Sequence, residues 1–223
     1  MNLLDLIELL EMDNLDIITY TSPLKIVATG KILGFSPASL VIDYGCGRGE
    51  ALALWGQYFG ISGIGIDCDA SFCECAQRRF MQQGLAGQLQ VVCADATAYP
   101  VALGSYDVAS CLNASDMWGG FQPTLQHLKS VVKPDGTVII AEPYFTIPHV
   151  PDELREWEGE RHTEAEILDI IHAEGCELLF IQRATAEECD IYRSHFRGDL
   201  QRIAATHMST YYRSAIFALQ LSR

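Results

Sequence analysis

The sequence has few basic residues for its length, and this shortage bears on its partners. Lys and Arg together number 15 against 29 Asp and Glu, which gives a formal net charge of −14 and a sequence pI near 4.7. A surface of this sign repels phosphate backbones. The basic residues near Arg78 and in residues 193–202 are mixed with acids and aromatics, so they form no basic patch. We therefore expect a small-molecule partner and no nucleic acid.

The chain also lacks a long apolar run. No stretch approaches the ~20 residues that a membrane-spanning helix requires. Residues 1–14 are apolar but acidic, without the basic start or the small-residue cleavage site of a signal peptide. Apolar residues recur at helical spacing from Leu3 to Leu10, so an amphipathic helix is expected within residues 1–22. These absences predict a cytoplasmic protein with no membrane partner.

Cysteine is plentiful, with 8 in all, but no two have the C-x-x-C spacing of zinc and redox motifs. Several lie in apolar, strand-like runs, as the reduced core thiols of cytosolic proteins do. Cys73 and Cys75 are two positions apart, and such neighbours on a helix point to different faces. Neither a disulfide framework nor a metal site is expected.

Short β-branched runs alternate with helical stretches, which is typical of βαβ units and a parallel sheet. Expected strands cover residues 39–44, 61–67, 88–93, 106–112, 137–142, 176–182 and 211–221. Expected helices cover residues 23–34, 50–58, 70–83, 121–131, 163–175 and 184–205. Residues 133–136 (KPDG) are a turn signal, and residues 143–151 form an irregular, proline-containing stretch.

A glycine-rich turn joins the first expected strand to the helix that follows it. Its sequence, DYGCGRGE, runs from Asp43 to Glu50. Glycines let the backbone adopt positive φ and approach a ligand, which would then lie at the N-terminus of a helix. The dinucleotide fingerprint G-x-G-x-x-G/A needs a small residue at the position of Glu50, which argues against a dehydrogenase. A tight turn without a ligand is the alternative interpretation.

The run VIDYGCGRGE resembles the first motif of class I S-adenosylmethionine-dependent methyltransferases. Four further segments resemble later motifs in the same order: GIGID, CADA, YDVASCLNAS and LKSVVKPDGTVIIAEPY. The resemblance covers about residues 23–223 and is nearest to an uncharacterised bacterial branch of methyltransferases of types 11 and 25. Two positions depart from that branch. Asn113 replaces the usual small residue, and Asp116 stands where a histidine or another polar residue is expected.

The resemblance implies an α/β fold with a Rossmann-like, doubly wound sheet of seven strands, mostly parallel with an antiparallel last strand. It implies S-adenosylmethionine as the methyl donor and S-adenosylhomocysteine as the product, with no metal. The glycines of the turn would cradle the amino-acid portion of the donor, and Asp67 would hold the ribose. The implied donor-binding residues are Asp43, Gly45, Cys46, Gly47, Gly49, Asp67, Cys68, Asp95, Ala96, Asn113 and Ala114, of which Asp95 and Ala96 would read adenine and Asn113 and Ala114 would flank the methionine end.

The catalytic side is harder to infer, because methyl transfer from a sulfonium is an in-line displacement in which positioning supplies most of the rate gain. A hydroxyl or protonated amine acceptor would still have to lose a proton. Asp116, Tyr144 and His149 are candidates for this role, since they follow the fourth and fifth strands. Packing at the rim of the site is an equally good interpretation of each.

Aromatic and histidine side chains leave similar alternatives. Candidates to line an acceptor pocket are Trp118, Phe145 and Trp157, with simple packing as the alternative. His127, His172 and His207 are interpreted as surface residues.

The function expected is methyl transfer to a small molecule by a single domain, residues 1–223. Residues 1–22, 144–161 and 184–209 would cover the acceptor. Three alternatives remain open: a donor-binding protein without transferase activity, an aminopropyltransferase on the same fold, and a dehydrogenase. Neither the acceptor nor the oligomeric state can be inferred from the sequence.

Overall fold

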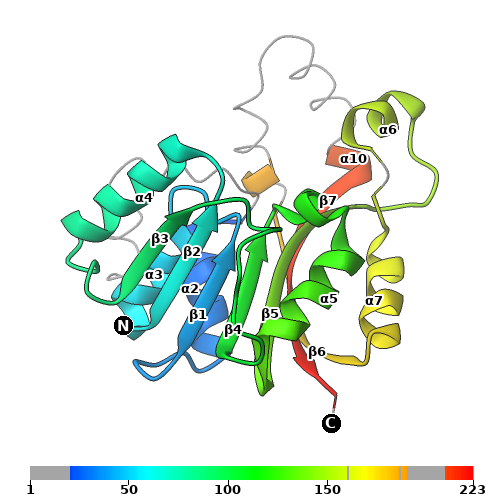
Figure 1. Ribbon diagram of the computed structural model, residues 1–223. Coiled ribbons are helices and arrows are strands. Elements are labelled where there is room, and N and C mark those ends of the chain that lie inside the picture. Colours follow the sequence, from blue (N-terminus) through cyan, green and yellow to red (C-terminus); the bar gives the residue numbers. More distant parts are fainter. Residues whose placement is uncertain (1–20, 160, 186, 190–208, 223) are drawn as a thin grey trace.

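The computed structural model describes residues 21–159, 161–185, 187–189 and 209–222 (Figure 1). The helix expected within residues 1–22 and most of the helix expected over residues 184–205 therefore lie outside the described residues. His207 lies outside them as well.

Seven strands form one sheet in the order β3-β2-β1-β4-β5-β7-β6 (Figure 1). Neighbouring strands from β3 to β5 are parallel, whereas β7 runs antiparallel between β5 and β6. This confirms the doubly wound sheet and its antiparallel last strand. The strand order reverses beside β1 and β4, and sheets of this kind bind ligands at the carboxyl ends of such strands. The strands are β1 Leu40–Tyr44, β2 Ser62–Asp67, β3 Leu89–Cys93, β4 Tyr106–Leu112, β5 Val132–Phe145, β6 Cys176–Arg183 and β7 Tyr212–Leu221.

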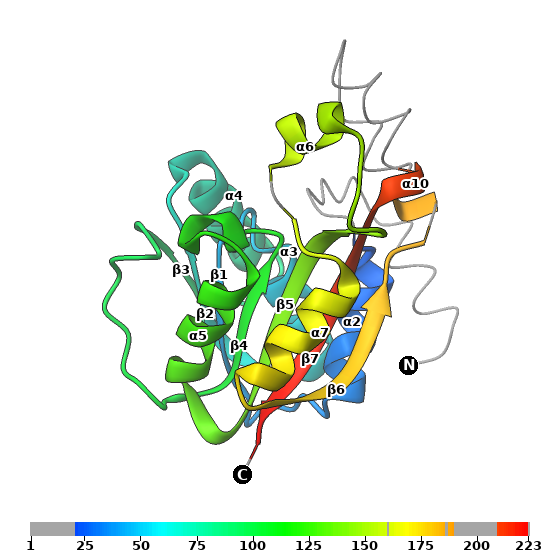
Figure 2. The same ribbon diagram turned by 90° about the vertical axis from the view of Figure 1, so that its right-hand side faces the viewer.

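Helices cover both faces of the sheet (Figure 2). On one face lie α2 (Pro23–Ile32), α3 (Glu50–Phe59) and α4 (Ala70–Gln82). On the other face lie α5 (Phe121–Val131) and α7 (Glu164–Ala173). Three short elements sit at the carboxyl edge of the parallel strands: the 3-10 helix η1 (Ser115–Trp118), α6 (Asp152–Glu158) and α10 (Ser209–Tyr211).

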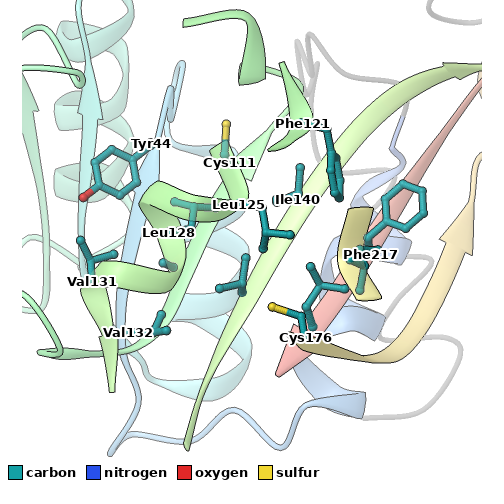
Figure 3. Packing of buried hydrophobic residues seen from close by; sticks show 14 of the residues in the cluster. Tyr44, Cys111, Phe121, Leu125, Leu128, Val131, Val132, Ile140, Cys176 and Phe217 are labelled. Atoms are coloured by element: carbon teal, nitrogen blue, oxygen red, sulfur yellow. The ribbon is translucent and has the colours of Figure 1, made fainter. Parts of the chain in front are cut away.

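The core under α5 shows why this helix forms where the sequence predicts it. Leu125 and Leu128 are fully buried against β4 and β5, and Phe121 packs edge-on against Phe217 of β7 (Figure 3). Each such side chain contributes roughly 1.5–3 kcal/mol when removed from water. The packing fixes the ends of β4 and β5, which carry the acceptor side of the candidate site.

β5 is longer than the sequence predicts at both ends. The expected turn at residues 133–136 is instead an irregularity within the strand, because the pairing passes from Tyr106–Val132 directly to Val108–Thr137. At the other end, Pro143 pairs with Ser214 although a proline was expected to leave the strand. A strand tolerates proline where one side has no partner, and the pairing with β4 ends at Ala141.

Candidate functional site

A cavity of about 350 Å³ lies at the carboxyl edge, above β1, β2 and β4. Seven of the predicted donor-binding residues lie in its wall: Asp43, Gly45, Cys46, Gly47, Asp67, Asn113 and Ala114. Three segments that are far apart in the sequence thus meet at one concave surface. We call this surface the donor cavity.

The three glycines of the turn are required for different structural reasons. Gly45, Gly47 and Gly49 all have positive φ, at 64°, 54° and 74°. A Cβ on Gly45 would lie 2.4 Å from the Cβ of Ala114, and one on Gly49 would lie 2.8 Å from Phe80 of α4. A Cβ on Gly47 would meet no atom within 4 Å. Gly45 and Gly49 therefore allow close packing, whereas Gly47 presents bare backbone to the donor cavity.

Asp67 is oriented toward the glycine turn at the end of β2. Its Oδ2 accepts a hydrogen bond from the N–H of Gly47 at 2.8 Å, and its Oδ1 accepts one from the N–H of Asp69 at 2.9 Å. The helix-capping role falls to Asp69, whose Oδ1 accepts from the N–H groups of Ser71 and Phe72. Asp67 is therefore not needed to cap α4. Each Asp67 oxygen still has a lone pair for a ligand hydroxyl.

Asp43 is a buried carboxyl in the wall of the donor cavity. Its Oδ1 accepts a hydrogen bond from the Ser110 hydroxyl at 2.6 Å. Burial raises the pKa of Asp43 to about 7, against the lowering effect of that hydrogen bond, and the charges of Asp67 and Glu50 raise it further. A cationic ligand group in this cavity would favour the ionised form of Asp43.

Asn113 stands at the end of β4 with a φ of 62°, and among the described non-glycine residues it alone has positive φ. Asn tolerates this conformation better than most side chains, which explains the departure from a small residue at this position. Its N–H donates to the carbonyl of Ala141 at 2.9 Å, and its Nδ2 donates to the Ser214 hydroxyl at 3.4 Å. The residue thereby joins β4, β5 and β7 at the site.

Two cysteines of the predicted set have different environments. Cys46 lies in the cavity wall but is buried, and burial raises the pKa of its thiol, so it is poorly suited to act as a nucleophile. It fills the space above Gly65, where a Cβ would lie 2.6 Å from the Cys46 sulfur. Cys68 is exposed and, like Gly49, lies outside the cavity wall.

The predicted adenine-binding residues lie at the end of β3, outside the wall of the donor cavity. Ala96 is buried in the core. Asp95 is exposed, and its Oδ1 accepts hydrogen bonds from the N–H and the hydroxyl of Thr97 at 2.9 and 2.7 Å. The adenine role of both residues stays a prediction.

Seven further residues complete the wall: Ile26, Arg48, Glu50, Ala51, Phe72, Leu112 and Met117. Arg48 lies 5.4 Å over the ring of Phe72, and Glu50 forms an ion pair with Arg79 at 2.7 Å. Arg48 and Glu50 belong to the glycine turn, so the motif itself could have pointed to them. Ile26 and Met117 reach the cavity from α2 and η1, and no local sequence signal marks them.

A second cavity of about 130 Å³ adjoins the donor cavity, and Asn113 lines both. Its wall consists of Asn113, Ser115, Asp116, Pro143, Glu158, Arg161 and Tyr212. The guanidinium of Arg161 binds both carboxylate oxygens of Asp116, at 2.7 and 2.9 Å. Of the three predicted catalytic residues, Asp116 is the one that lines this acidic cavity.

The other two catalytic candidates lie elsewhere. Tyr144 lines a separate cavity on the side of α7, together with Thr146 and Glu164. Burial and a hydrogen bond with Glu164 raise the pKa of Tyr144 to about 12. His149 is exposed and lines neither the donor cavity nor the second cavity.

The aromatic candidates whose side chains are described form packing contacts. Trp118 stacks on His127 with ring centroids 4.5 Å apart, and both rings meet Tyr44 edge-on. The interpretation of His127 as a surface residue is therefore wrong, because its ring is packed between β1 and η1 and burial lowers its pKa. His172 is exposed, as predicted. Phe145 is buried and packs against Tyr212.

Within the described part of the chain, no three or more His, Cys, Asp or Glu residues are grouped so that they could hold a metal ion. The same residues include no helix that is both long and apolar enough to cross a membrane.

The sheet order and the glycine turn define a Rossmann-like fold of the methyltransferase type, and known proteins of similar sequence and structure agree with it. Residues 41–136 match a family model described as a methyltransferase domain. The structure of YjhP from Escherichia coli superposes with a TM-score of 0.82 and 26% identity, covering 93% of this chain and 95% of that one. Over residues 41–136 the chain is therefore similar to this methyltransferase family, and its fold is that of the S-adenosylmethionine-dependent methyltransferases.

Two further comparisons define the relationship. The curated sequence of YjhP from E. coli (strain K12), described as uncharacterized, is 36% identical over 121 residues, which are 54% of this chain and 48% of YjhP. The aligned part thus spans about half the length of that relative. A methyltransferase from Thiobacillus denitrificans, solved in complex with S-adenosylhomocysteine, has a TM-score of 0.80 and 26% identity over 93% of this chain and 94% of its own.

Proposed function

We propose that this protein transfers the methyl group of S-adenosylmethionine to a small-molecule acceptor and releases S-adenosylhomocysteine. The observation that carries the proposal is the donor cavity, in which the bare backbone of Gly47, the carboxylate of Asp67 and the strained Asn113 face one enclosed space. The complex of the Thiobacillus denitrificans relative with S-adenosylhomocysteine supports the identity of the donor.

The geometry suggests how the donor would lie. The backbone at Gly45 and Gly47 would hold its amino-acid portion, and Asp67 would accept hydrogen bonds from the two ribose hydroxyls. Adenine would extend toward the end of β3, where Asp95 and Ala96 are its predicted partners. The methionine end would then lie near Asn113 and Ala114, within the field of the buried Asp43 carboxyl. A negative charge there suits the sulfonium and ammonium charges of the donor.

In the chemical step the acceptor attacks the methyl carbon as the carbon–sulfur bond breaks, so the sulfonium becomes a neutral sulfide. This displacement needs alignment more than acid–base chemistry. The acceptor would enter beside Asn113, from the second cavity, under a cover that includes α6. Where the acceptor must lose a proton, Asp116 is placed closest to its path. Tyr144 and His149 stay predictions, and a phenol with a pKa of about 12 is a weak base candidate at neutral pH.

The alternatives differ in testable ways. An aminopropyltransferase would prefer the decarboxylated donor, and a donor-binding protein would bind without turnover. A dehydrogenase is disfavoured because Glu50, which pairs with Arg79, occupies the position where the dinucleotide fingerprint has a small residue. We also infer a cytoplasmic location, since all eight cysteines are free thiols.

Calorimetric titration of the purified protein tests the proposal. We expect S-adenosylmethionine and S-adenosylhomocysteine to bind, NAD not to bind, and Asp67→Ala to remove the binding. Incubation with labelled donor and a panel of small amines, alcohols, thiols and acids would then identify the acceptor class. Binding of NAD in place of the sulfur compounds, or a preference for the decarboxylated donor, would overturn the methyltransferase assignment.

A further inference from the structure

The described residues in and around the second cavity carry more negative than positive charge. Among the described residues of its wall, Arg161 is the one cation, and two residues, Asp116 and Glu158, are carboxylates. A third carboxylate, Glu142 of β5, has its Oε1 3.6 Å from Nη1 of Arg161. Asp116 holds the guanidinium by two hydrogen bonds, while Glu158 lies 3.8 Å from its Nε. Within the described part of the chain, one positive charge thus faces three acidic groups.

Two buried polar atoms of this group have no hydrogen-bond partner. They are Oε2 of Glu142 and Nε of Arg161. Glu142 is 4% exposed, so its carboxylate has little contact with bulk solvent. Leaving a charged group buried and unpaired costs more than leaving a neutral one, and such sites are commonly completed by a ligand or by a proton. The unpaired atoms are one acceptor and one donor, so the excess of carboxylates around Arg161 decides the charge and makes a cation, and not an anion, the complementary ligand.

We propose that the second cavity binds a protonated amine of the methyl acceptor, held by the carboxylates of Asp116 and Glu158 in its wall and favoured by the charge of the buried Glu142 behind Arg161. The inference rests on the proposed function, since it places the acceptor beside the methyl donor at Asn113. An ammonium group carries three hydrogen-bond donors and fits a space of about 130 Å³. An acceptor carboxylate or phosphate would instead meet three acidic groups and an arginine already bound by Asp116.

Burial and neighbouring charges set the pKa values of the buried acidic groups. Burial raises the pKa of Glu142 to about 7; Ser115 and Arg161 oppose this effect, and Asp116 adds to it. Burial likewise raises the pKa of Glu158, although its hydrogen bond from Tyr212 lowers it. Among the described residues, the buried Cys111 thiol of β4 is a further ionisable neighbour of Glu142. An ammonium group favours ionised carboxylates, so amine binding is expected to release protons near neutral pH and to strengthen as pH rises from 6 to 8.

An isosteric series tests the charge preference directly. Propylamine, 1-propanol and propionate are titrated by NMR into the protein saturated with S-adenosylhomocysteine. Propylamine, which stays protonated from pH 6 to 8, is expected to bind about ten-fold more tightly than 1-propanol, with propionate weakest. Equal binding of the three compounds, or tighter binding of propionate, would overturn the proposal.

Variants assign the preference to this cavity. Asp116→Asn and Glu142→Gln should each weaken propylamine binding about five-fold or more, and Glu142→Gln should also reduce the pH dependence, leaving the part due to Glu158. Asp169→Asn and Glu177→Gln make the same chemical changes at exposed positions of α7 and β6 and should alter neither. Retained binding of S-adenosylhomocysteine shows that a variant is folded. If the wild type does not bind S-adenosylhomocysteine, the proposed function fails; if it does and both cavity variants bind propylamine normally, the amine site alone is refuted.

Discussion

Asp67 and Gly47 are 20 positions apart in the sequence, yet the N–H of Gly47 donates a hydrogen bond of 2.8 Å to the Asp67 carboxylate. The bond ties the end of β2 to the glycine turn that follows β1. Together with the N–H of Asp69, it fixes the orientation of both carboxylate oxygens before any ligand binds. A site organised in this way loses little side-chain entropy on binding.

Two neighbouring aspartates allow a matched test of this arrangement. Asp67→Asn replaces one acceptor oxygen by an NH₂ group, which cannot accept the hydrogen bonds of the backbone or of ribose. We expect S-adenosylmethionine to bind about 10- to 100-fold more weakly, as follows from losing hydrogen bonds to a charged group. Asp69→Asn keeps a good helix cap and should change the affinity less than about two-fold. Calorimetry that showed equal losses for both variants would contradict a ribose role for Asp67.

Alanine variants of two glycines can separate the effect of backbone strain from the effect of filling space that a ligand needs. Gly34 and Gly47 have φ values of 70° and 54°, and a Cβ on either would meet no atom within 4 Å. Gly34→Ala and Gly47→Ala should therefore lower the free energy of unfolding by a similar amount, about 1 kcal/mol. Because Gly47 lines the donor cavity, its variant alone should also weaken donor binding. Urea denaturation and donor titration of both variants check this, and unimpaired binding by Gly47→Ala would remove the case for close backbone approach.

The buried Asp43 predicts a dependence of stability on pH. Its pKa is about 7 in the folded protein and ordinarily 3.8, so the folded state binds more protons between these values. The free energy of unfolding should therefore fall as pH rises from about 4 to about 7, by up to about 1.4 kcal/mol per pH unit for one full proton. Glu142 contributes in the same direction.

Substitution of Asp43 isolates its contribution to the pH dependence of the free energy of unfolding. In Asp43→Asn the hydrogen bond from Ser110 can persist while the titration is lost, so the decline between pH 4 and 7 should become shallower than in the wild type. The exposed Asp169→Asn should leave the slope unchanged. Urea denaturation at several pH values gives the slopes, and parallel curves for the wild type and Asp43→Asn would show that Asp43 is ionised throughout.

The parts of the fold that could be predicted are those coded by local patterns. β-branched runs place the parallel strands within a residue or two, and the cap at Asp69 and the capping box of Thr163 and Glu166 follow from side-chain chemistry within one helical turn. The exception is β5, where local turn residues lie inside a strand. Partner strands decide this, because β7 pairs with Pro143–Phe145 beyond the end of β4.

In the candidate site, too, the residues marked by local sequence patterns could be predicted and those placed by tertiary packing could not. Glycine spacing and strand-end acids indicated half of the donor cavity, since these residues must lie near the carboxyl ends of parallel strands. Ile26 and Met117 could not be inferred, because they reach the cavity through tertiary packing. The ion pair of Asp116 and Arg161 spans 45 positions and leaves no periodic signal. Glu142 reads as the end of an apolar strand, and its isolation from water becomes evident only when α6 and β7 are in place.

His127 supplies a final test, because its packing was missed in the sequence. Burial lowers the pKa of His127 below 6.5, so the unfolded state binds a proton more readily as the pH falls through that value. Acidification from pH 7 to 5 should therefore lower the free energy of unfolding through His127, and His127→Gln should lose this component. His172→Gln, at an exposed position of α7, should retain it. Protonated His127 should also quench its stacked neighbour Trp118, with a fluorescence midpoint below 6.5 that disappears in Trp118→Phe. A midpoint at or above 6.5 would mean that the ring is solvated, as the sequence first indicated.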